Sequence, residues 1–256
     1  MWSLHSFYYK TRHQVYTSRR HLFEAFGYDR FSRAGLDGLD ARLQSYVDFE
    51  NGFFIEAGAN DGFTQSNTYW LERFRGWHGI LIEPLPALFE RCKQERPGSL
   101  VVHCALVSTS WRETHVTMRS AGLMSFVEGV FHQPDAQPAH ERSATRLHLF
   151  SKDEPPLKVP ARTLNAVLRE YPDLPPIDLL SLDVEGGERQ VLEGLDFNRH
   201  QPGWILIETD NLEAVRPLLS SHYDLVSQLS YHDYLIQYKS DDRNGKQKPE
   251  ARPCQF

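Results

Sequence analysis

The chain has 256 residues, enough for one sizeable α/β domain with excursions. Its 34 acidic side chains outnumber the 28 basic ones, and the net charge of −6 argues against nucleic acid as the main partner, because phosphate binding needs clustered Lys and Arg. No segment approaches the roughly 18 apolar residues of a membrane span. The spacings of Cys92, Cys104 and Cys254 fit neither a metal motif nor a disulfide framework. We therefore expect a cytoplasmic protein with no membrane span and a small-molecule partner, and a homo-oligomer remains open.

The two ends of the chain differ in composition from the middle. The first 20 residues contain four basic residues and no acid, a composition that also allows an organellar transit segment. Apolar positions at helical spacing follow in residues 36–50. We expect residues 1–50 to form a helical cover on a domain spanning residues 51–239. Residues 240–256 form a polar tail outside that domain.

Short apolar runs alternate with segments of helical pattern along residues 51–239. This order predicts an α/β, Rossmann-like fold, with a mostly parallel seven-stranded sheet and helices on both faces. The predicted strands are Phe53–Glu56, Ile80–Glu83, Leu100–Cys104, Leu179–Asp183, Ile205–Glu208, Leu225–Gln228 and Tyr234–Tyr238. The predicted helices are Gln65–Phe74, Pro86–Glu95, Arg162–Glu170, Glu188–Leu195 and Leu212–Ser220. The closing pair of strands reads as a hairpin, which gives an antiparallel last strand.

The segment GFFIEAGANDGFTQSN (Gly52–Asn67) combines an apolar run, a turn of small residues and a helix start. Parallel α/β sheets offer their strand ends to nucleotide-like ligands through turns of this kind. We expect Gly58 and Gly62 to let the backbone approach the ligand closely, which a Cβ would prevent. The residues predicted to contact the cofactor here are Glu56, Gly58, Ala59, Asn60, Asp61 and Ser66.

A second motif, GILIEP (Gly79–Pro84), ends another apolar run on an acid, Glu83, which lies 25 residues after Gly58. An acid at the tip of the second strand is well placed to accept hydrogen bonds from both hydroxyls of a ribose. The dinucleotide fingerprint and the phosphate loop are both absent. An adenosine without a pyrophosphate indicates S-adenosylmethionine. The alternative is a plain βαβ unit whose strand happens to end on an acid.

Residues 108–160 form an unusually long connection. It contains a candidate strand, Thr114–Met118, then GLMSF (Gly122–Phe126), and a candidate helix over Ala139–Phe150. A long connection near the carboxyl ends of the strands is a candidate substrate lid. The alternative is a variable surface excursion.

Six sequence blocks together resemble the FkbM family of S-adenosylmethionine-dependent methyltransferases. In chain order they are FIEAGANDG, ILIEP, ALVS (Ala105–Ser108), TLNAVL (Thr163–Leu168), IDLLSLDVEGGERQVLEGL (Ile177–Leu195) and ILIET (Ile205–Thr209). The resemblance covers roughly residues 45–240. It implies a class I methyltransferase fold and S-adenosyl-L-methionine as cofactor, with Ala105 and Asp183 among its contacts. Glu56 stands where the family more often has Asp, and this departure concerns the substrate.

Acids at two further strand ends are the candidate catalytic residues. Asp183 ends the predicted fourth strand at the switch point of the sheet and would hold the acceptor or lie beside the sulfonium, or else cap the next helix. Glu185 would be a general base, or simply a favourable acid at a helix N-terminus. Glu208 ends the fifth strand and faces the same crevice. We expect no metal; if one is present, Asp183, Glu208 and Asp210 would hold it.

The resemblance implies O-methylation of a hydroxyl on a small polar acceptor, such as a sugar or natural product. One alternative is methyl-ester formation on a carboxylate, with Arg142 and Arg146 of the lid as anchors because Arg pairs bidentately with carboxylates. A second alternative is a non-catalytic domain that kept the fold. No particular His is singled out as a base by the sequence.

Overall fold

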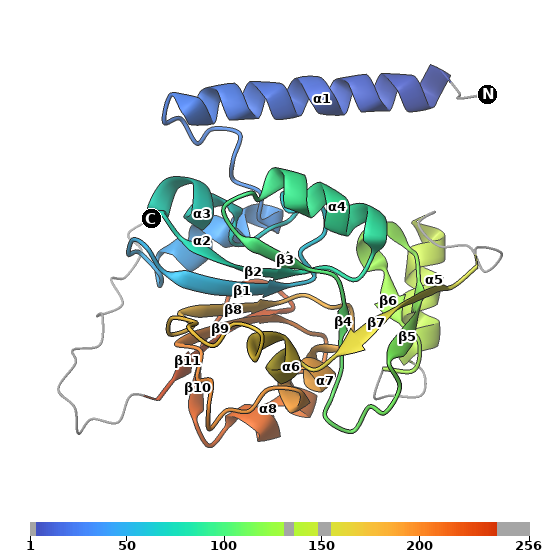
Figure 1. The fold of residues 1–256 in the computed structure, drawn as a ribbon, viewed down its shortest axis with the longest axis vertical. Helices are drawn as coiled ribbons and strands as arrows, with labels where there is room; N and C mark the ends of the chain where they lie inside the picture. The colour runs from blue at the N-terminus through green and yellow to red at the C-terminus, as the bar shows by residue number, and fades with distance from the viewer. Residues whose placement is uncertain (1–3, 131–135, 148–154, 240–256) are drawn as a thin grey trace.

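The computed structural model describes residues 4–130, 136–147 and 155–239, with the side chains of residues 15 onward. A seven-stranded sheet lies at its centre, in the order β10-β11-β9-β8-β1-β2-β3 (Figure 1). The strands are β1 (Phe53–Ala57), β2 (His78–Ile82), β3 (Leu100–Val102), β8 (Leu179–Leu182), β9 (Trp204–Glu208), β10 (Tyr223–Gln228) and β11 (Asp233–Tyr238). All neighbours from β9 to β3 pair in parallel, and β11 runs antiparallel to both β9 and β10. The predicted sheet and its antiparallel member are confirmed.

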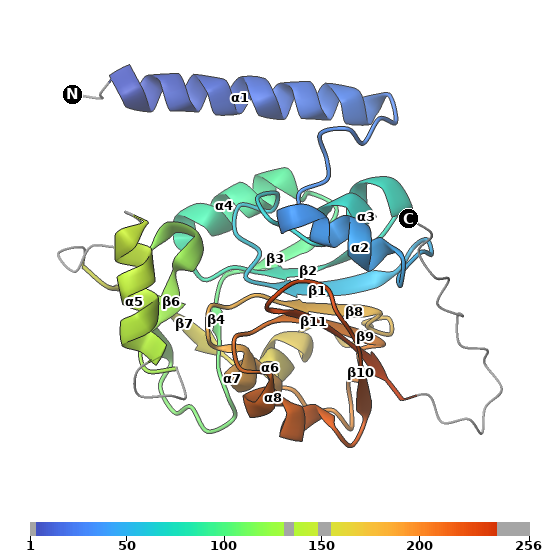
Figure 2. The same cartoon turned by 180° about the vertical axis from the view of Figure 1, so that it is seen from behind.

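Helices cover both faces of this sheet (Figures 1 and 2). On one side lie α2 (Leu39–Gln44), which follows the short helix η1 (Leu36–Gly38), α3 (Tyr69–Arg75) and α4 (Pro86–Glu95). On the other side lie α6 (Leu164–Leu168), α7 (Glu188–Glu193) and α8 (Leu212–Leu219). Helix α8 includes Pro217 and ends at Leu219.

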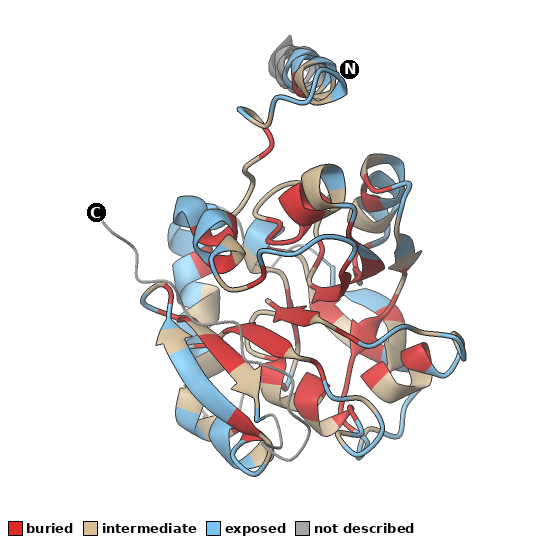
Figure 3. Cartoon of the chain, turned by 90° about the vertical axis from the view of Figure 1, so that its left-hand side faces the viewer, coloured by how far each residue is buried: buried red, intermediate tan, exposed pale blue. Residues whose placement is uncertain are grey.

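The core is divided between the two faces because successive side chains of a strand point to opposite sides. Ile55, Ile80 and Ile205 belong to the cluster that includes residues of α6, α7 and α8. Phe54 and Leu81 belong to the other, with residues of α2 and α3. All five residues of β1 are buried, as expected for a central strand covered on both faces. Figure 3 shows buried residues gathered in the interior of the molecule and exposed ones on the outer helices and loops.

A smaller four-stranded sheet stands beside the carboxyl ends of the central strands (Figure 1). It has the order β4-β7-β5-β6 and comprises β4 (Ala105–Leu106), β5 (His115–Arg119), β6 (Phe126–Val127) and β7 (Leu157–Arg162). The helices η2 (Gly122–Met124) and α5 (Ala136–Arg146) belong to the same segment. The candidate strand over Thr114–Met118 is present as β5. The candidate helix over Ala139–Phe150 is present as α5, which begins three residues earlier, at Ala136, and ends at Arg146. Residues 148–150 of the candidate helix lie outside the described residues. Strand β7 was not predicted.

The N-terminal helix α1 (Leu4–Ala25) runs along the side of the molecule that carries α4 (Figures 1 and 2). Arg20 anchors it: the residue is 1% exposed, and its Nη2 donates to Oε1 of Glu95 on α4 at 2.5 Å. The same guanidinium lies 3.5 Å from the ring centroid of Phe63, in the turn after β1. No helix among the described residues is both long and apolar enough to cross a membrane. The role of residues 1–50 as a cover stays a prediction.

Candidate active site

The turn after β1 brings the ends of three strands together. The backbone N–H groups of Gly58 and Ala59 donate to the carbonyl of Ile82 at 3.0 and 3.1 Å. Gly58 has φ +85°, and a Cβ built there would lie 1.7 Å from the carbonyl oxygen of Asp183. The missing side chain of Gly58 therefore admits the backbone of the next strand end. Gly58 also lines the cavity described below, and the expected approach of a ligand to its backbone stays a prediction.

Gly62 also serves packing within the protein. With φ +85°, its Cβ would meet Cγ of Arg96 at 2.9 Å and Cα of Cys92 at 3.2 Å, both against α4. Asp61 organises the same turn, because its Oδ1 accepts from the backbone N–H groups of Phe63 and Thr64 at 3.0 and 2.7 Å. The predicted helix over Gln65–Phe74 begins only at Tyr69, since this turn and the φ of +60° at Gln65 are incompatible with a helix.

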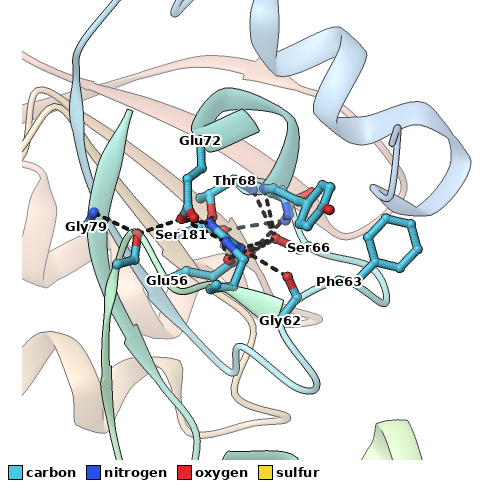
Figure 4. Close-up of polar contacts among 12 residues, drawn as sticks. Glu56, Gly62, Phe63, Ser66, Thr68, Glu72, Gly79 and Ser181 are labelled. Atoms are coloured by element: carbon cyan, nitrogen blue, oxygen red, sulfur yellow. Dashed lines mark hydrogen bonds and ion pairs between the residues drawn. The ribbon is translucent and has the colours of Figure 1, made fainter. Parts of the chain in front are cut away.

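Glu56 lies in a buried polar network behind the turn (Figure 4). Its carboxylate accepts hydrogen bonds from the hydroxyls of Ser66 and Thr68 at 2.9 and 2.6 Å and from the backbone N–H of Asn67 at 2.9 Å. Arg96, fully buried, lies 3.5 Å from the same carboxylate. Through these contacts Glu56 and Ser66 stabilise the turn after β1 from within the protein interior. The structure does not place them on the wall of the cavity described below.

Glu83 follows β2 directly and stands at the end of that strand. Its Oε2 accepts from the backbone N–H of Asn60 at 2.9 Å, and its Oε1 accepts from that of Leu85 at 2.8 Å. Burial raises the pKa of this carboxyl to about 7, against the lowering effect of the two N–H groups. A carboxylate has further lone pairs on both oxygens. Glu83 can therefore still accept hydrogen bonds from a ligand in the cavity that it lines.

The segment DVEGGE forms the turn between β8 and α7. Glu185 and Gly186 both have left-handed backbone conformations, with φ of +54° and +94°. The backbone N–H of Gly186 donates to Oε1 of buried Glu188 at 2.9 Å, which holds the turn in shape. Asp183 and Glu185 line the cavity. Glu188, which the sequence reasoning did not choose as a site residue, stabilises the turn that carries both acids through its hydrogen bond with Gly186.

Carboxyl groups crowd this end of the site. Burial, followed by repulsion from Glu208 and Glu185, raises the pKa of Asp183 well above its ordinary range. Burial and the neighbouring Glu208 raise the pKa of Glu185 to about 8. Burial raises the pKa of Glu188 to about 7. The group therefore retains protons near neutral pH, because several like charges cannot all ionise in one buried place.

Glu208 lies behind Asp183 and does not line the cavity. Burial raises the pKa of Glu208, whereas His232 and a hydrogen bond with Asp183 lower it. Nε2 of His232 lies 3.5 Å from Oε1 of Glu208 and 3.7 Å from Oδ2 of Asp233. One ligand atom from each of these three lies within 4.8 Å of the others, a grouping that could hold a metal ion. Asp210, expected in such a set, is exposed and directly precedes Asn211, the N-cap residue of α8.

A cavity of about 90 Å³ lies between these strand ends and the smaller sheet. Six predicted site residues line it: Gly58, Asn60, Glu83, Ala105, Asp183 and Glu185. Five others do not: Glu56, Ala59, Asp61, Ser66 and Glu208. Ligand sites usually enclose roughly 300–1,000 Å³. The cavity in this structure is smaller than that range.

Sequence reasoning expected a substrate lid in residues 108–160 but named as site residues none of those that this segment places on the cavity wall. They are Met118, Gly122, Leu123, Ser125, Val127 and Val130. The motif GLMSF, between two short strands, was the available signal. The two lid arginines, Arg142 and Arg146, are exposed on α5 and do not line the cavity. His132 and His148 lie outside the described residues.

The strand order, the antiparallel β11 and a cavity at the switch point between β1 and β8 define a class I, Rossmann-like methyltransferase fold. The sequence model of the Methyltransferase FkbM domain matches residues 56–236, well over half of the chain. The protein belongs to the FkbM methyltransferase family. This membership confirms the expected enzyme class and S-adenosyl-L-methionine as the expected cofactor. Among curated proteins, none matches this chain.

Solved structures with a similar chain trace are distant in sequence. A methyltransferase FkbM from Methylobacillus flagellatus KT is 13% identical, with a TM-score of 0.42 over 81% of this chain and 56% of its own. A TehB-like SAM-dependent methyltransferase from Corynebacterium glutamicum is 12% identical, with a TM-score of 0.39 over 90% of this chain and all of its own. A SAM-dependent methyltransferase from Thiobacillus denitrificans, in complex with S-adenosyl-L-homocysteine, is 12% identical, with a TM-score of 0.34 over 81% of this chain and 72% of its own.

Proposed function

We propose that the protein transfers a methyl group from S-adenosylmethionine to a hydroxyl oxygen of a small polar acceptor, such as a sugar or natural product. The observation that carries this proposal is the character of the cavity. Three acids, Glu83, Asp183 and Glu185, line it, and no described Lys or Arg does. A hydroxyl acceptor needs a base and tolerates negative surroundings.

The residues present fit the cofactor. Glu83 would hold the ribose hydroxyls through its remaining lone pairs, and the apolar wall at Leu85, Ala105 and Leu106 would hold the adenine. The turn at Gly58 and Asn60 would face the amino-acid part of the cofactor. When bound, S-adenosylmethionine supplies a methyl carbon that an acceptor oxygen can displace in line from sulfur. In this proposal Glu56 and Ser66 act from behind, by holding the turn.

Glu185 is the side chain we assign as the general base. It lines the cavity, and its pKa of about 8 lies close to neutral pH, where a base is most effective. Asp183 lies beside it and would orient the acceptor hydroxyl. Glu208, hydrogen-bonded to Asp183, would position that side chain. Because Glu185 must be ionised to accept a proton, methyl transfer should rise with pH through that value.

Methyl-ester formation is disfavoured by the same surroundings. An ionised carboxylate acceptor would enter a cavity lined by three acids. The arginines expected to anchor it, Arg142 and Arg146, are exposed on α5. We therefore retain the hydroxyl acceptor and propose no metal ion in the transfer.

The experiment is transfer of a radioactive methyl group to a panel of hydroxyl-bearing metabolites, each paired with its carboxylate-bearing counterpart. We expect hydroxyl compounds to be methylated and E185Q to lower kcat by about 100-fold or more. The matched control is E193Q on α7, the helix that follows the turn of Glu185, where Glu193 pairs with Arg189. Methylation of the carboxylate members alone, with a rate that is flat between pH 6 and 9, would overturn the proposal.

A further inference from the structure

One side chain of the smaller lobe reaches the acids at the strand ends. His140 lies on α5, and its Nε2 is 3.7 Å from Oε2 of Glu185. The same Nε2 is 2.9 Å from the carbonyl oxygen of Met124 in η2. The edge-to-face contact of its ring with Phe126, at 5.0 Å between centroids, fixes the ring plane. The side chain is 13% exposed, so it is held by the protein on most sides.

The contact with Met124 determines which ring nitrogen carries a proton. A carbonyl oxygen can only accept, so Nε2 of His140 must be the donor. The protonated nitrogen, which carries partial positive charge on its N–H, lies 3.7 Å from Oε2 of Glu185. This holds for the neutral and for the protonated ring alike.

The surroundings of Glu185 make that partial positive charge important. Its charged neighbours are acids on three other segments: Asp183 directly after β8, Glu188 on α7, and Glu208 at the end of β9 with Asp210 just after it. Within 4.0 Å of its carboxylate, the described part of the chain offers one basic group, and this is His140. The backbone φ of +54° at Glu185 carries a conformational cost for a residue other than glycine.

We infer that His140 is a positioning residue for methyl transfer: its imidazole holds the Glu185 carboxylate at the cavity wall and acts on the acceptor only through it. The inference rests on the proposed function, in which Glu185 is the base. It also links α5 to the chemistry, because the carboxylate is held correctly only while α5 and η2 lie against the strand ends.

The test observes the Glu185 carboxyl directly and needs no acceptor. The protein is labelled with carbon-13 at glutamate carboxyls, the Glu185 signal is assigned from its loss in E185Q, and its titration midpoint is measured by NMR. H140F keeps the aromatic packing on Phe126 but has no N–H. We expect the midpoint to rise by at least about half a pH unit, because only acids remain near Glu185. H140Q, which restores an N–H donor, should move it back.

The matched control is Q190A. Gln190 on α7 donates through Nε2 to the carbonyl of Val130, so this variant loosens a second contact of the smaller lobe without touching Glu185. Its midpoint should stay where it is. The reciprocal measurement is the Nε2–H resonance of His140, which should move in E185Q and not in Q190A. An unmoved midpoint in folded H140F, an equal shift in Q190A, or an unmoved His140 resonance in E185Q would each overturn the inference.

Activity separates this inference from the proposed function. On an acceptor found in the panel, H140F should lower kcat about threefold or more below pH 7, with KM for S-adenosylmethionine within about twofold. Unaltered kcat with methyl transfer intact would reject the role of His140 and leave the proposed function standing. No methyl transfer to either class of acceptor would reject the proposed function, and with it the catalytic meaning of the contact.

Discussion

Replacing Glu83 should weaken cofactor binding by a predictable amount. Two ribose hydroxyls donating to an ionised carboxylate contribute about 1.5–3 kcal/mol each, so Glu83→Ala should cost about 3–6 kcal/mol, or at least a hundredfold in Kd. The pKa of about 7 reduces this only slightly. At pH 7 about half of the molecules carry the ionised form, which costs about 0.4 kcal/mol. Glu83→Gln, similar in volume, should lose at least tenfold.

The assay is titration calorimetry with S-adenosylhomocysteine at several pH values. Because hydroxyl donors favour the ionised carboxylate, wild-type affinity should fall about tenfold from pH 8 to pH 6, and binding near pH 7 should release protons. Glu90→Gln, on the exposed side of α4, is the control and should bind normally. The reasoning fails if folded Glu83→Ala binds as tightly as the wild type, or if wild-type affinity is the same at pH 6 and pH 8.

Two further predictions concern stability. Gly58→Ala should lower the free energy of unfolding in urea by several kcal/mol, because the new Cβ would lie 1.7 Å from the Asp183 carbonyl oxygen. The control is Gly129→Ala, which has a similar positive φ and no atom within 4 Å and should cost only about 1 kcal/mol. Equal losses in the two variants would contradict the packing role of Gly58. The folded pKa of Glu188, about 7, lies above its unfolded value of 4.5, so the folded protein binds the extra proton and stability falls as pH rises between those values. Glu188→Gln should therefore gain about 1–3 kcal/mol over the wild type at pH 8 but little at pH 4.5, and an unchanged pH slope would reject this account.

The central sheet could be predicted because its strands are short apolar runs in a regular alternation with helices. The ends of the elements were less predictable where side chains compete with the backbone. At the start of α3, Asp61 binds the N–H groups of Phe63 and Thr64 and delays the helix to Tyr69. Such a turn depends on one side chain, which periodicity does not register.

The smaller sheet was largely unpredictable for a different reason. Two of its strands, β4 and β6, have only two residues each, too few to show an alternating pattern. Strand β7 contains Pro160, which argues against a strand, yet it pairs with β4 on one side and β5 on the other. Its partners are distant in sequence, and only the folded sheet brings them together.

Glu56 and Glu83 show how far a sequence motif can locate a site. Both acids end apolar runs, and both were predicted to face the cofactor. Glu56 still belongs to β1, where it pairs in register with Leu81, and its side chain must take one face of the sheet, toward Ser66 and Arg96. Glu83 comes one residue after β2 ends, so no face of the sheet dictates its direction. A shift of two positions relative to the strand end turns a carboxylate from a buried support into part of the cavity wall. Strand ends are known to this accuracy only when the neighbouring strands are in place, and cofactor binding therefore has to be tested at Glu83 before any other acid.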